Sequence, residues 1–150
     1  MKILYIHPET NDVAIVHLMP RKQVARFNPQ VANLNETAYI LWHANQSVPK
    51  GVPYKVVKDD FIVDRAFRNA LTMDMDYDKD KCVEITKNRL RLERAPLLAQ
   101  SDADFIRALE ENDKKKEAAV RAEKKRLRDI TLLAHEGLTL AELKALKCSQ

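Results

Sequence analysis

Short runs of alternating apolar and polar residues fill the first part of the chain. KILYIH at residues 2–7 and DVAIVHL at residues 12–18 are rich in β-branched residues, and the PETN between them is typical of a turn. The two runs predict a β-hairpin, and a loop from Glu9 to Asp12 would set Tyr5 opposite Val16. Both faces of this hairpin are partly apolar, so we expect other elements to cover it on both sides. YKVV at residues 54–57 predicts a third strand paired with the hairpin.

A short helix is predicted within residues 33–51, between the hairpin and this third strand. Asn33 and Glu36 have the spacing of a capping box, in which each side chain bonds the backbone of the other residue. The apolar stripe expected to face the sheet consists of Ala38, Leu41 and Trp42. Residues 64–71 predict one or two further helical turns, capped by Asp64.

After about residue 78 the apolar positions take a helical spacing. Val83, Leu90 and Leu97 lie seven residues apart, and Ile85 and Leu92 form a second row beside them. Pro96 should kink or stop this helix, because proline has no backbone N–H and its ring clashes with the preceding turn. Ser101 followed by Asp104 predicts a new helix start. The segment from Arg91 to Phe105 is therefore predicted to form a helix, a corner and a second helix.

The next helix is predicted to run to about Asp129. Asn112 and Asp113 indicate a weak break, but favourable i, i+4 charge pairs cross it, so residues 101–130 could form one helix or two. Thr139 and Glu142 have the spacing of a capping box that opens a last short helix.

These patterns predict an α+β protein with two lobes. Residues 1–77 form a small antiparallel β-lobe with one covering helix, and residues 78–150 form an α-helical lobe built around a helical hairpin. The apolar edge of its last long helix is thin, with Val120 and Leu127 at heptad-like spacing. Such an edge forms a seam with one other helix, which can belong to the same chain or to a partner.

Composition limits the class of protein. The longest apolar runs fall well short of the roughly 18 residues that span a membrane, and the start of the chain lacks the apolar core of a secretory signal. We therefore expect the chain to stay in the cytoplasm in which it is made, away from membranes. Cys82 and Cys148 share no motif and are expected to be free thiols.

The net charge of +4 is concentrated in one segment. Residues 81–129 carry fourteen basic and ten acidic side chains, whereas the two flanking segments are balanced. In the expected helix, four basic side chains fall within about 60° of one another, at Lys114, Arg121, Lys125 and Arg128. This stripe could contact nucleic-acid phosphates, or it could be the solvated back of a packed helix. The chain has no aromatic residue after Phe105 on which bases could stack there.

The sequence contains no recognisable catalytic or metal-binding motif. The histidines are scattered, and the acidic run from Asp74 to Asp80 lacks the central glycine of a calcium loop. No nucleophile sits in a recognisable elbow. We therefore expect a protein that is not an enzyme and that has no metal and no cofactor.

Two groups of residues are candidates for contacts with another protein. Arg65 and Arg68 on either side of Phe67 could clamp an acidic partner, or could pair with nearby carboxylates such as Asp59. The second group either holds the helical lobe together or meets a partner, and it consists of Leu92, Leu97, Leu98, Phe105, Val120 and Leu127.

Two stretches of the chain resemble known sequences. VPKGVPYKVVKDDFIVDRAFRNALTMD at residues 48–74 resembles the middle of small uncharacterised proteins encoded in tailed-bacteriophage genomes, where a V-P-x-G-x-P-Y strand leads to a D-R-x-F-R-x-A segment. KNRLRLERAPLLAQSDADFIRALEEND at 87–113 and AAVRAEKKRLRDIT at 118–131 resemble the helical ends of these proteins. The helical half is also similar to the C-terminal regions of phage tail-fibre assembly proteins. Leu71 departs from the pattern, which favours an aromatic residue there.

The resemblance implies a non-enzymatic protein of a tailed bacteriophage and no catalytic residues. Such a protein would bind phage tail or fibre proteins, either as a structural component of the virion or as an assembly factor, a chaperone for tail fibres. It would be assembled in the host cytoplasm and could also associate with itself as an oligomer. The competing expectation is a basic nucleic-acid-binding accessory protein that uses residues 114–128.

Overall fold

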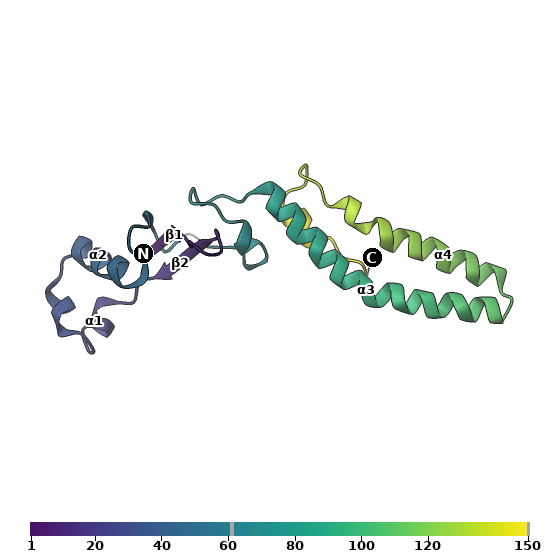
Figure 1. Ribbon diagram of the computed structural model, residues 1–150, viewed down its shortest axis with the longest axis horizontal. Helices are drawn as coiled ribbons and strands as arrows, with labels where there is room; N and C mark the ends of the chain where they lie inside the picture. The colour runs from purple at the N-terminus through teal and green to yellow at the C-terminus, as the bar shows by residue number, and fades with distance from the viewer. Residues whose placement is uncertain (61, 150) are drawn as a thin grey trace. The chain divides into compact units, whose positions relative to one another are not determined.

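The computed structural model describes residues 1–60 and 62–149 (Figure 1). The chain divides into two compact units, Met1–Tyr77 and Asp78–Gln150. The first unit contains β1 (Lys2–Ile6), β2 (Val13–His17), α1 (Arg21–Val24), η1 (Pro29–Asn33), α2 (Glu36–Ser47), β3 (Tyr54–Val57) and η2 (Arg65–Ala70). The second contains α3 (Lys79–Glu110), α4 (Lys114–Asp129), η3 (Ile130–Leu133) and α5 (Leu140–Ala145). The protein is therefore of the α+β class, as predicted.

The first unit is built on a three-stranded antiparallel sheet with the strand order β2-β1-β3. Tyr5 of β1 lies opposite Ala14 of β2 and Tyr54 of β3, so the hairpin and the third strand are confirmed. The predicted pairing of Tyr5 with Val16 was wrong by two residues, because the ladder continues until the His7 N–H bonds the Asp12 carbonyl. A shift of two residues keeps every side chain on its predicted face.

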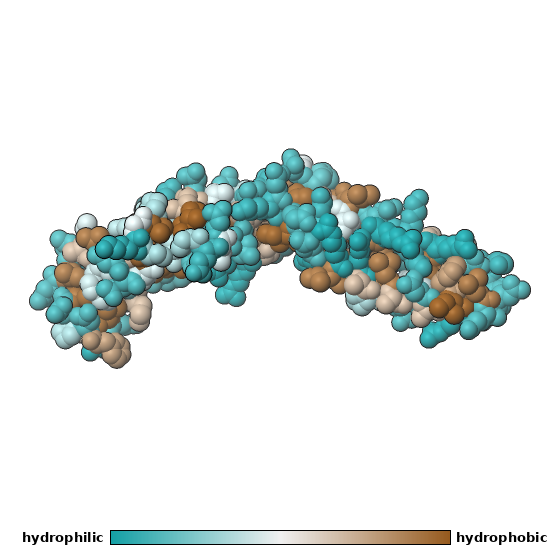
Figure 2. Space-filling model, viewed as in Figure 1, coloured by the Kyte–Doolittle hydropathy of each residue, from teal (hydrophilic) through white to brown (hydrophobic). Residues whose placement is uncertain are grey.

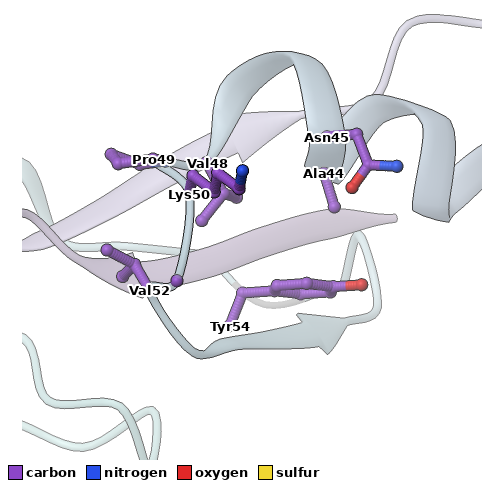
Figure 3. A pocket seen from close by; sticks show the side chains of 8 residues that line it. Ala44, Asn45, Val48, Pro49, Lys50, Val52 and Tyr54 are labelled. Carbon is purple, nitrogen blue, oxygen red and sulfur yellow. The ribbon is translucent and has the colours of Figure 1, made fainter.

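Other elements contribute to both faces of the sheet, as the apolar pattern requires. On one face, buried Leu4, Val13 and Val57 pack with Leu71. On the other face, Ile3 is fully buried and Tyr5 nearly so. Figure 3 shows the end of α2 passing over this second face, with Ala44 above Tyr54 of β3.

The start and the buried face of α2 differ from the prediction. The N-cap is Asn35, whose Oδ1 accepts a hydrogen bond from the Ala38 N–H at 2.8 Å, and Asn33 belongs to η1. The residues of α2 that are buried are Tyr39, His43 and Ala44. Leu41 of the predicted stripe is half exposed, because Tyr39 takes the inner position and packs against Val24 and Val31 of the preceding segment.

In the second unit, α3 is one helix of 32 residues. The predicted corner between Arg91 and Phe105 is therefore wrong: Pro96 lies inside the helix, and the Ser101 hydroxyl donates to the Leu97 carbonyl one turn back instead of starting a new helix.

A mid-helix proline costs about 3 kcal/mol. Buried residues on both sides of Pro96, Leu90 and Ala108, nevertheless keep the two halves together. Figure 1 shows the axis of α3 changing direction part-way along, so the predicted kink is present.

Helices α3 and α4 form a helical hairpin within the chain. Asn112 has a left-handed backbone (φ 54°), and Asp113 caps α4 by accepting from the N–H groups of Lys115 and Lys116. Residues 101–130 thus contain the end of one helix and the whole of a second. Leu127 and Ile130 are buried in one cluster with Leu90 of α3, so the thin apolar edge of α4 packs inside the chain.

The end of the chain folds back on α3. Thr139 and Glu142 form the predicted capping box at the start of α5. The Arg89 guanidinium donates to the carbonyls of Leu143 and Leu146, at 3.0 and 2.9 Å. Cys148 is buried, and its thiol lies 3.4 Å from the Leu90 carbonyl.

Candidate protein-binding surfaces

An apolar row follows the side of α3 that faces away from α4. This row consists of Ile85, Leu92, Ala99 and Ile106, which lie seven residues apart, and we call it the outer row. At about 100° per residue they fall on the opposite side of the helix from the buried Leu90 and Ala108. Leu92 is 77% exposed and Ile106 is 56% exposed. Brown, apolar side chains stand among hydrophilic ones on the surface of the helical unit in Figure 2.

The middle of the outer row is lined by small side chains. Ala95, Pro96 and Ala103 lie within about 60° of the row's centre line, on either side of Ala99. Ala95, Pro96 and Ala99 are exposed. Small residues let a second helix come close, whereas Leu92 and Ile106 supply apolar area one heptad to each side.

Only one of the predicted leucines of α3 belongs to the outer row, namely Leu92. Leu98 packs against the buried cluster around Leu90, and Leu97 is 38% exposed. Phe105 is partly buried, with the Arg121 guanidinium 5.2 Å and the Lys124 ammonium 5.3 Å from its ring centre. These contacts hold α3 and α4 together.

The predicted partner residues of α4 are directed mostly into the chain. Leu127 is only 1% exposed, so its predicted partner contact is made with the chain itself. Val120 is partly buried.

The basic stripe of α4 is partly neutralised. The Glu117 carboxylate lies 3.1 Å from the Lys114 ammonium and 2.6 Å from the Arg121 guanidinium. The hydrogen bond from Lys114 and the nearby charges hold the pKa of Glu117 below its usual value. Lys125 and Arg128 are exposed and make no ion pair within the described part of the chain. Glu117 carries one negative charge, so it offsets one of the four positive charges of the stripe.

A basic hollow lies on the first unit beside β2. It measures about 460 Å³, and its lining residues are Lys2, Ile15, His17, Ile62, Val63, Arg65 and Arg68. Arg65 and Arg68 are exposed and, among the described residues, do not pair with Asp59, Asp60 or Asp64. Asp59 pairs instead with the amino terminus. Phe67, predicted to meet a partner, is 2% exposed and belongs to the core.

Another hollow of about 370 Å³ lies between the end of α2 and β3 (Figure 3). It is formed by the turn around Gly51, whose φ of 84° favours glycine. Its lining combines Val48, Pro49 and Val52 with the side chains of Lys50 and Tyr54. Lys50 and Tyr54 are the ionisable side chains among the residues that line it.

The buried ionisable groups of the first unit are joined in a packing network. The Tyr39 hydroxyl donates to the Met19 carbonyl at 2.7 Å, so the His43 Nε2–H donates to the Tyr39 oxygen at 2.9 Å. Burial lowers the pKa of His43 and raises the pKa of Tyr39. Trp42 stacks on Tyr39 and meets the edge of His43. The network ties α2 to the segment that follows β2.

Residues 1–60 and 62–149 contain no cluster of three or more histidine, cysteine, aspartate or glutamate side chains that could hold a metal ion. The same residues include no helix that is both long and apolar enough to cross a membrane.

Comparisons with known proteins give no relative for this chain. No family model matches it, and no significant match was found among curated proteins or solved structures.

The sequence alone indicated part of these surfaces. The spacing of Ile85 and Leu92 pointed to the outer row, and extending it by two further heptads reaches Ala99 and Ile106. The basic hollow was indicated only by its two arginines. Lys2 and His17 come from strands that are far from η2 in sequence and meet it only in the fold, so no local pattern signals them.

Proposed function

We propose that the chain is a non-enzymatic protein-binding component of a tailed bacteriophage, either a structural part of the tail or an assembly factor for its fibres. The observation that carries the proposal is the outer row of α3. Leu92 and Ile106 keep large apolar side chains in water, and removing apolar surface from water contributes about 25 cal/mol for each Å². A second polypeptide helix with apolar residues at heptad spacing would bury these two side chains, and the free energy of that burial would stabilise the complex.

The basic hollow of the first unit supplies a second type of contact. The guanidinium groups of Arg65 and Arg68 can bind carboxylates in pairs, and exposed Ile62 offers an apolar contact beside them. An acidic segment of another phage protein fits this combination. The phage context itself is proposed from the resemblance of residues 48–74, 87–113 and 118–131 to tailed-phage proteins.

The alternative of nucleic-acid binding receives less support. The single Glu117 carboxylate pairs with both Lys114 and Arg121, so only Lys125 and Arg128 of the stripe have no ion pair among the described residues. If this stripe were the functional surface, Lys125→Glu with Arg128→Glu would abolish salt-sensitive retardation of DNA or RNA in a gel.

The test replaces the apolar row with charge. Leu92→Lys together with Ile106→Lys should abolish co-purification with phage particles or with their fibre proteins, because a lysine cannot enter a dry helix seam without losing hydration. Leu132→Lys is the matched control, since Leu132 is 74% exposed but lies outside the row. Circular dichroism should show unchanged helix content in both variants.

Association with particles or fibre proteins that persists in the row variant would overturn the assignment of this surface. A wild-type chain that sediments with neither particles nor fibre proteins would overturn the phage proposal as a whole.

A further inference from the structure

Strand β2 is an outer strand of the sheet, and one of its edges is free to pair. The Leu18 N–H bonds the Met1 carbonyl, which places the backbone groups of the even-numbered residues of β2 on the side of β1. Val13, Ile15 and His17 therefore direct their backbone N–H and C=O groups away from the sheet. Within the described part of the chain, these outward groups have no hydrogen-bond partner.

The edge of β2 also lacks the usual protection against further pairing. Natural edge strands are commonly protected by charged residues, by proline or by a covering element. The sequence of β2, VAIVH, contains no proline and no lysine, arginine, aspartate or glutamate. At the other edge of the sheet, β3 follows Pro53 and carries Lys55, which pairs with Asp74. Of the two edges, β2 is therefore the one suited to receive another strand.

Two hollows follow β2 on the face of the sheet that packs against Leu71. The basic hollow lies at the end of the strand, beside Ile15 and His17. A second hollow of about 260 Å³ lies at its start, beside Val13. Arg68 lines both hollows. A strand added to β2 would extend this face of the sheet, and every second side chain of it would point toward the side on which the hollows lie.

The charge of the two hollows favours an acidic strand. Arg65 and Arg68 are exposed and make no ion pair among the described residues. Lys2 and His17 add two further basic side chains, and Asp12 is the one carboxylate among the described lining residues. A guanidinium can bind a carboxylate through two parallel hydrogen bonds. A second copy of β2 would instead bring the arginines of both copies onto one face, so the charges oppose pairing between copies.

We propose that β2 binds an extended acidic segment of a partner protein, which adds antiparallel to its open edge and directs its acidic side chains toward Arg65 and Arg68. The inference rests on the proposed function, that the chain binds other proteins, and it names the kind of segment that the basic hollow receives. In an antiparallel pair, the residues that exchange backbone hydrogen bonds have their side chains on the same face. The residues of the segment that bond Val13, Ile15 and His17 are therefore its acidic ones.

An eight-residue peptide of alternating glutamate and valine, with blocked ends, is the probe for this site. Titrated into the full chain labelled with ¹⁵N, it should shift the amide signals of Val13, Ile15 and His17 and slow their hydrogen exchange. The matched peptide of alternating lysine and valine should leave these signals unchanged. Unchanged signals with 5 mM of the glutamate peptide would overturn the proposal.

Methylation of the peptide nitrogens tests for strand addition. Methyl groups on the glutamate nitrogens remove the N–H groups that face β2, so they should weaken binding by about tenfold or more. Methyl groups on the valine nitrogens point away from β2 and should change binding less than about twofold. Equal binding by the two methylated peptides would show that charge alone is recognised, and a greater loss on valine methylation would indicate a parallel strand. Either result would overturn the proposal.

Reversal of the two arginine charges tests the choice of an acidic segment. Arg65→Glu with Arg68→Glu should weaken binding of the glutamate peptide by about tenfold or more, because its carboxylates would then meet like charges. Lys22→Glu with Arg26→Glu is the matched control, since both residues are exposed in the same unit and the change in net charge is the same. Circular dichroism should be unchanged in both variants. An equal loss of binding in the two variants would show that net charge attracts the peptide and would overturn the proposal.

Peptide binding and phage association can fail separately. A chain that sediments with phage particles but shows no change at β2 with the glutamate peptide would overturn strand addition and keep the proposed function. A chain that binds the peptide along β2 but associates with neither particles nor fibre proteins would support strand addition and overturn the phage proposal.

Discussion

Tyr39 and His43 show how single residues of the first unit serve packing. The two side chains are buried and share one hydrogen-bond chain that ends at the Met19 carbonyl. A buried imidazole is stable in its neutral form, because burial disfavours the charged form and lowers its pKa. The network therefore makes the first unit sensitive to acid.

The pH dependence follows in sign from this lowered pKa. As pH falls below about 6.5, the unfolded chain binds a proton at His43 before the folded chain does. The free energy of unfolding therefore decreases with falling pH until the folded-state pKa is passed. We expect His43→Gln, which keeps a nitrogen near the Tyr39 hydroxyl, to reduce this decrease, as measured by thermal melting of the first unit between pH 7.5 and 5.

The exposed His135 on the second unit provides a control. His135→Gln should leave the acid sensitivity of the first unit unchanged. An equal pH dependence in the wild type and in His43→Gln would show that His43 does not cause it.

At the scale of elements, Pro96 sets the course of α3. The residue is exposed, and it lacks an N–H for the Leu92 carbonyl, so it is expected to bend the helix. Pro96→Ala restores a backbone hydrogen bond and removes a steric clash. We expect it to raise the free energy of unfolding of the second unit by about 1–3 kcal/mol, measured by urea denaturation.

The reverse exchange is the control. Ala122→Pro, at an exposed position inside α4, should destabilise the same unit by about 3 kcal/mol or more. If Pro96→Ala instead lowered the free energy of unfolding, this would show that the packing of the second unit requires the bend in α3.

The turn between α3 and α4 depends on one cap. Asp113 accepts two backbone hydrogen bonds at 3.1 and 3.0 Å, and these bonds hold its pKa below the usual value. Asp113→Ala should lower the free energy of unfolding by about 1 kcal/mol, read from the urea midpoint. Asp113→Asn should retain most of this stability, since asparagine also caps helices well. An equal loss in both variants would show that the negative charge of Asp113, and not its hydrogen bonds, stabilises the turn.

Local signals in the sequence were enough for most elements. The hairpin, β3, the limits of α4 and the capping box of α5 each depend on neighbouring residues, such as Thr139 and Glu142, whose chemistry is local. Packing decided the other cases. Pro96 and Ser101 have the local character of a helix stop and start, but burial on both sides of them keeps α3 continuous. Leu41 is apolar enough for a core, but Tyr39 occupies the inner face.

Surfaces were harder to predict than elements. Two apolar rows of α3 have the same seven-residue period: Val83, Leu90 and Leu97 form one, and Ile85 and Leu92 belong to the other. The period alone therefore does not tell which row is buried and which is exposed. The position of α4 decides which row is covered. The basic hollow needs three segments to meet, and no single stretch carries its pattern.

At the scale of the whole molecule, the two units have separate cores. The chain passes from one to the other between Tyr77 and Asp78, and Asp78 caps α3 by accepting from the Lys81 N–H. We expect residues 78–150 expressed alone to be helical and to unfold cooperatively, as followed by circular dichroism. Residues 81–150, which lack the cap, should be less stable by about 1 kcal/mol. A disordered 78–150 fragment would show that the helical unit needs the rest of the chain.

Because the chain end packs back onto α3, the reactivity of Cys148 reports how often this segment detaches. Cys148 is 2% exposed, its thiol lies against the Leu90 carbonyl, and burial raises its pKa, so a thiol reagent reaches it only after the tail detaches. The rate of alkylation therefore counts these detachments in the native protein, without any attached dye. The Arg89 guanidinium binds three carbonyls of the C-terminal segment. Arg89→Ala should therefore raise the rate of Cys148 alkylation while the helix content stays constant.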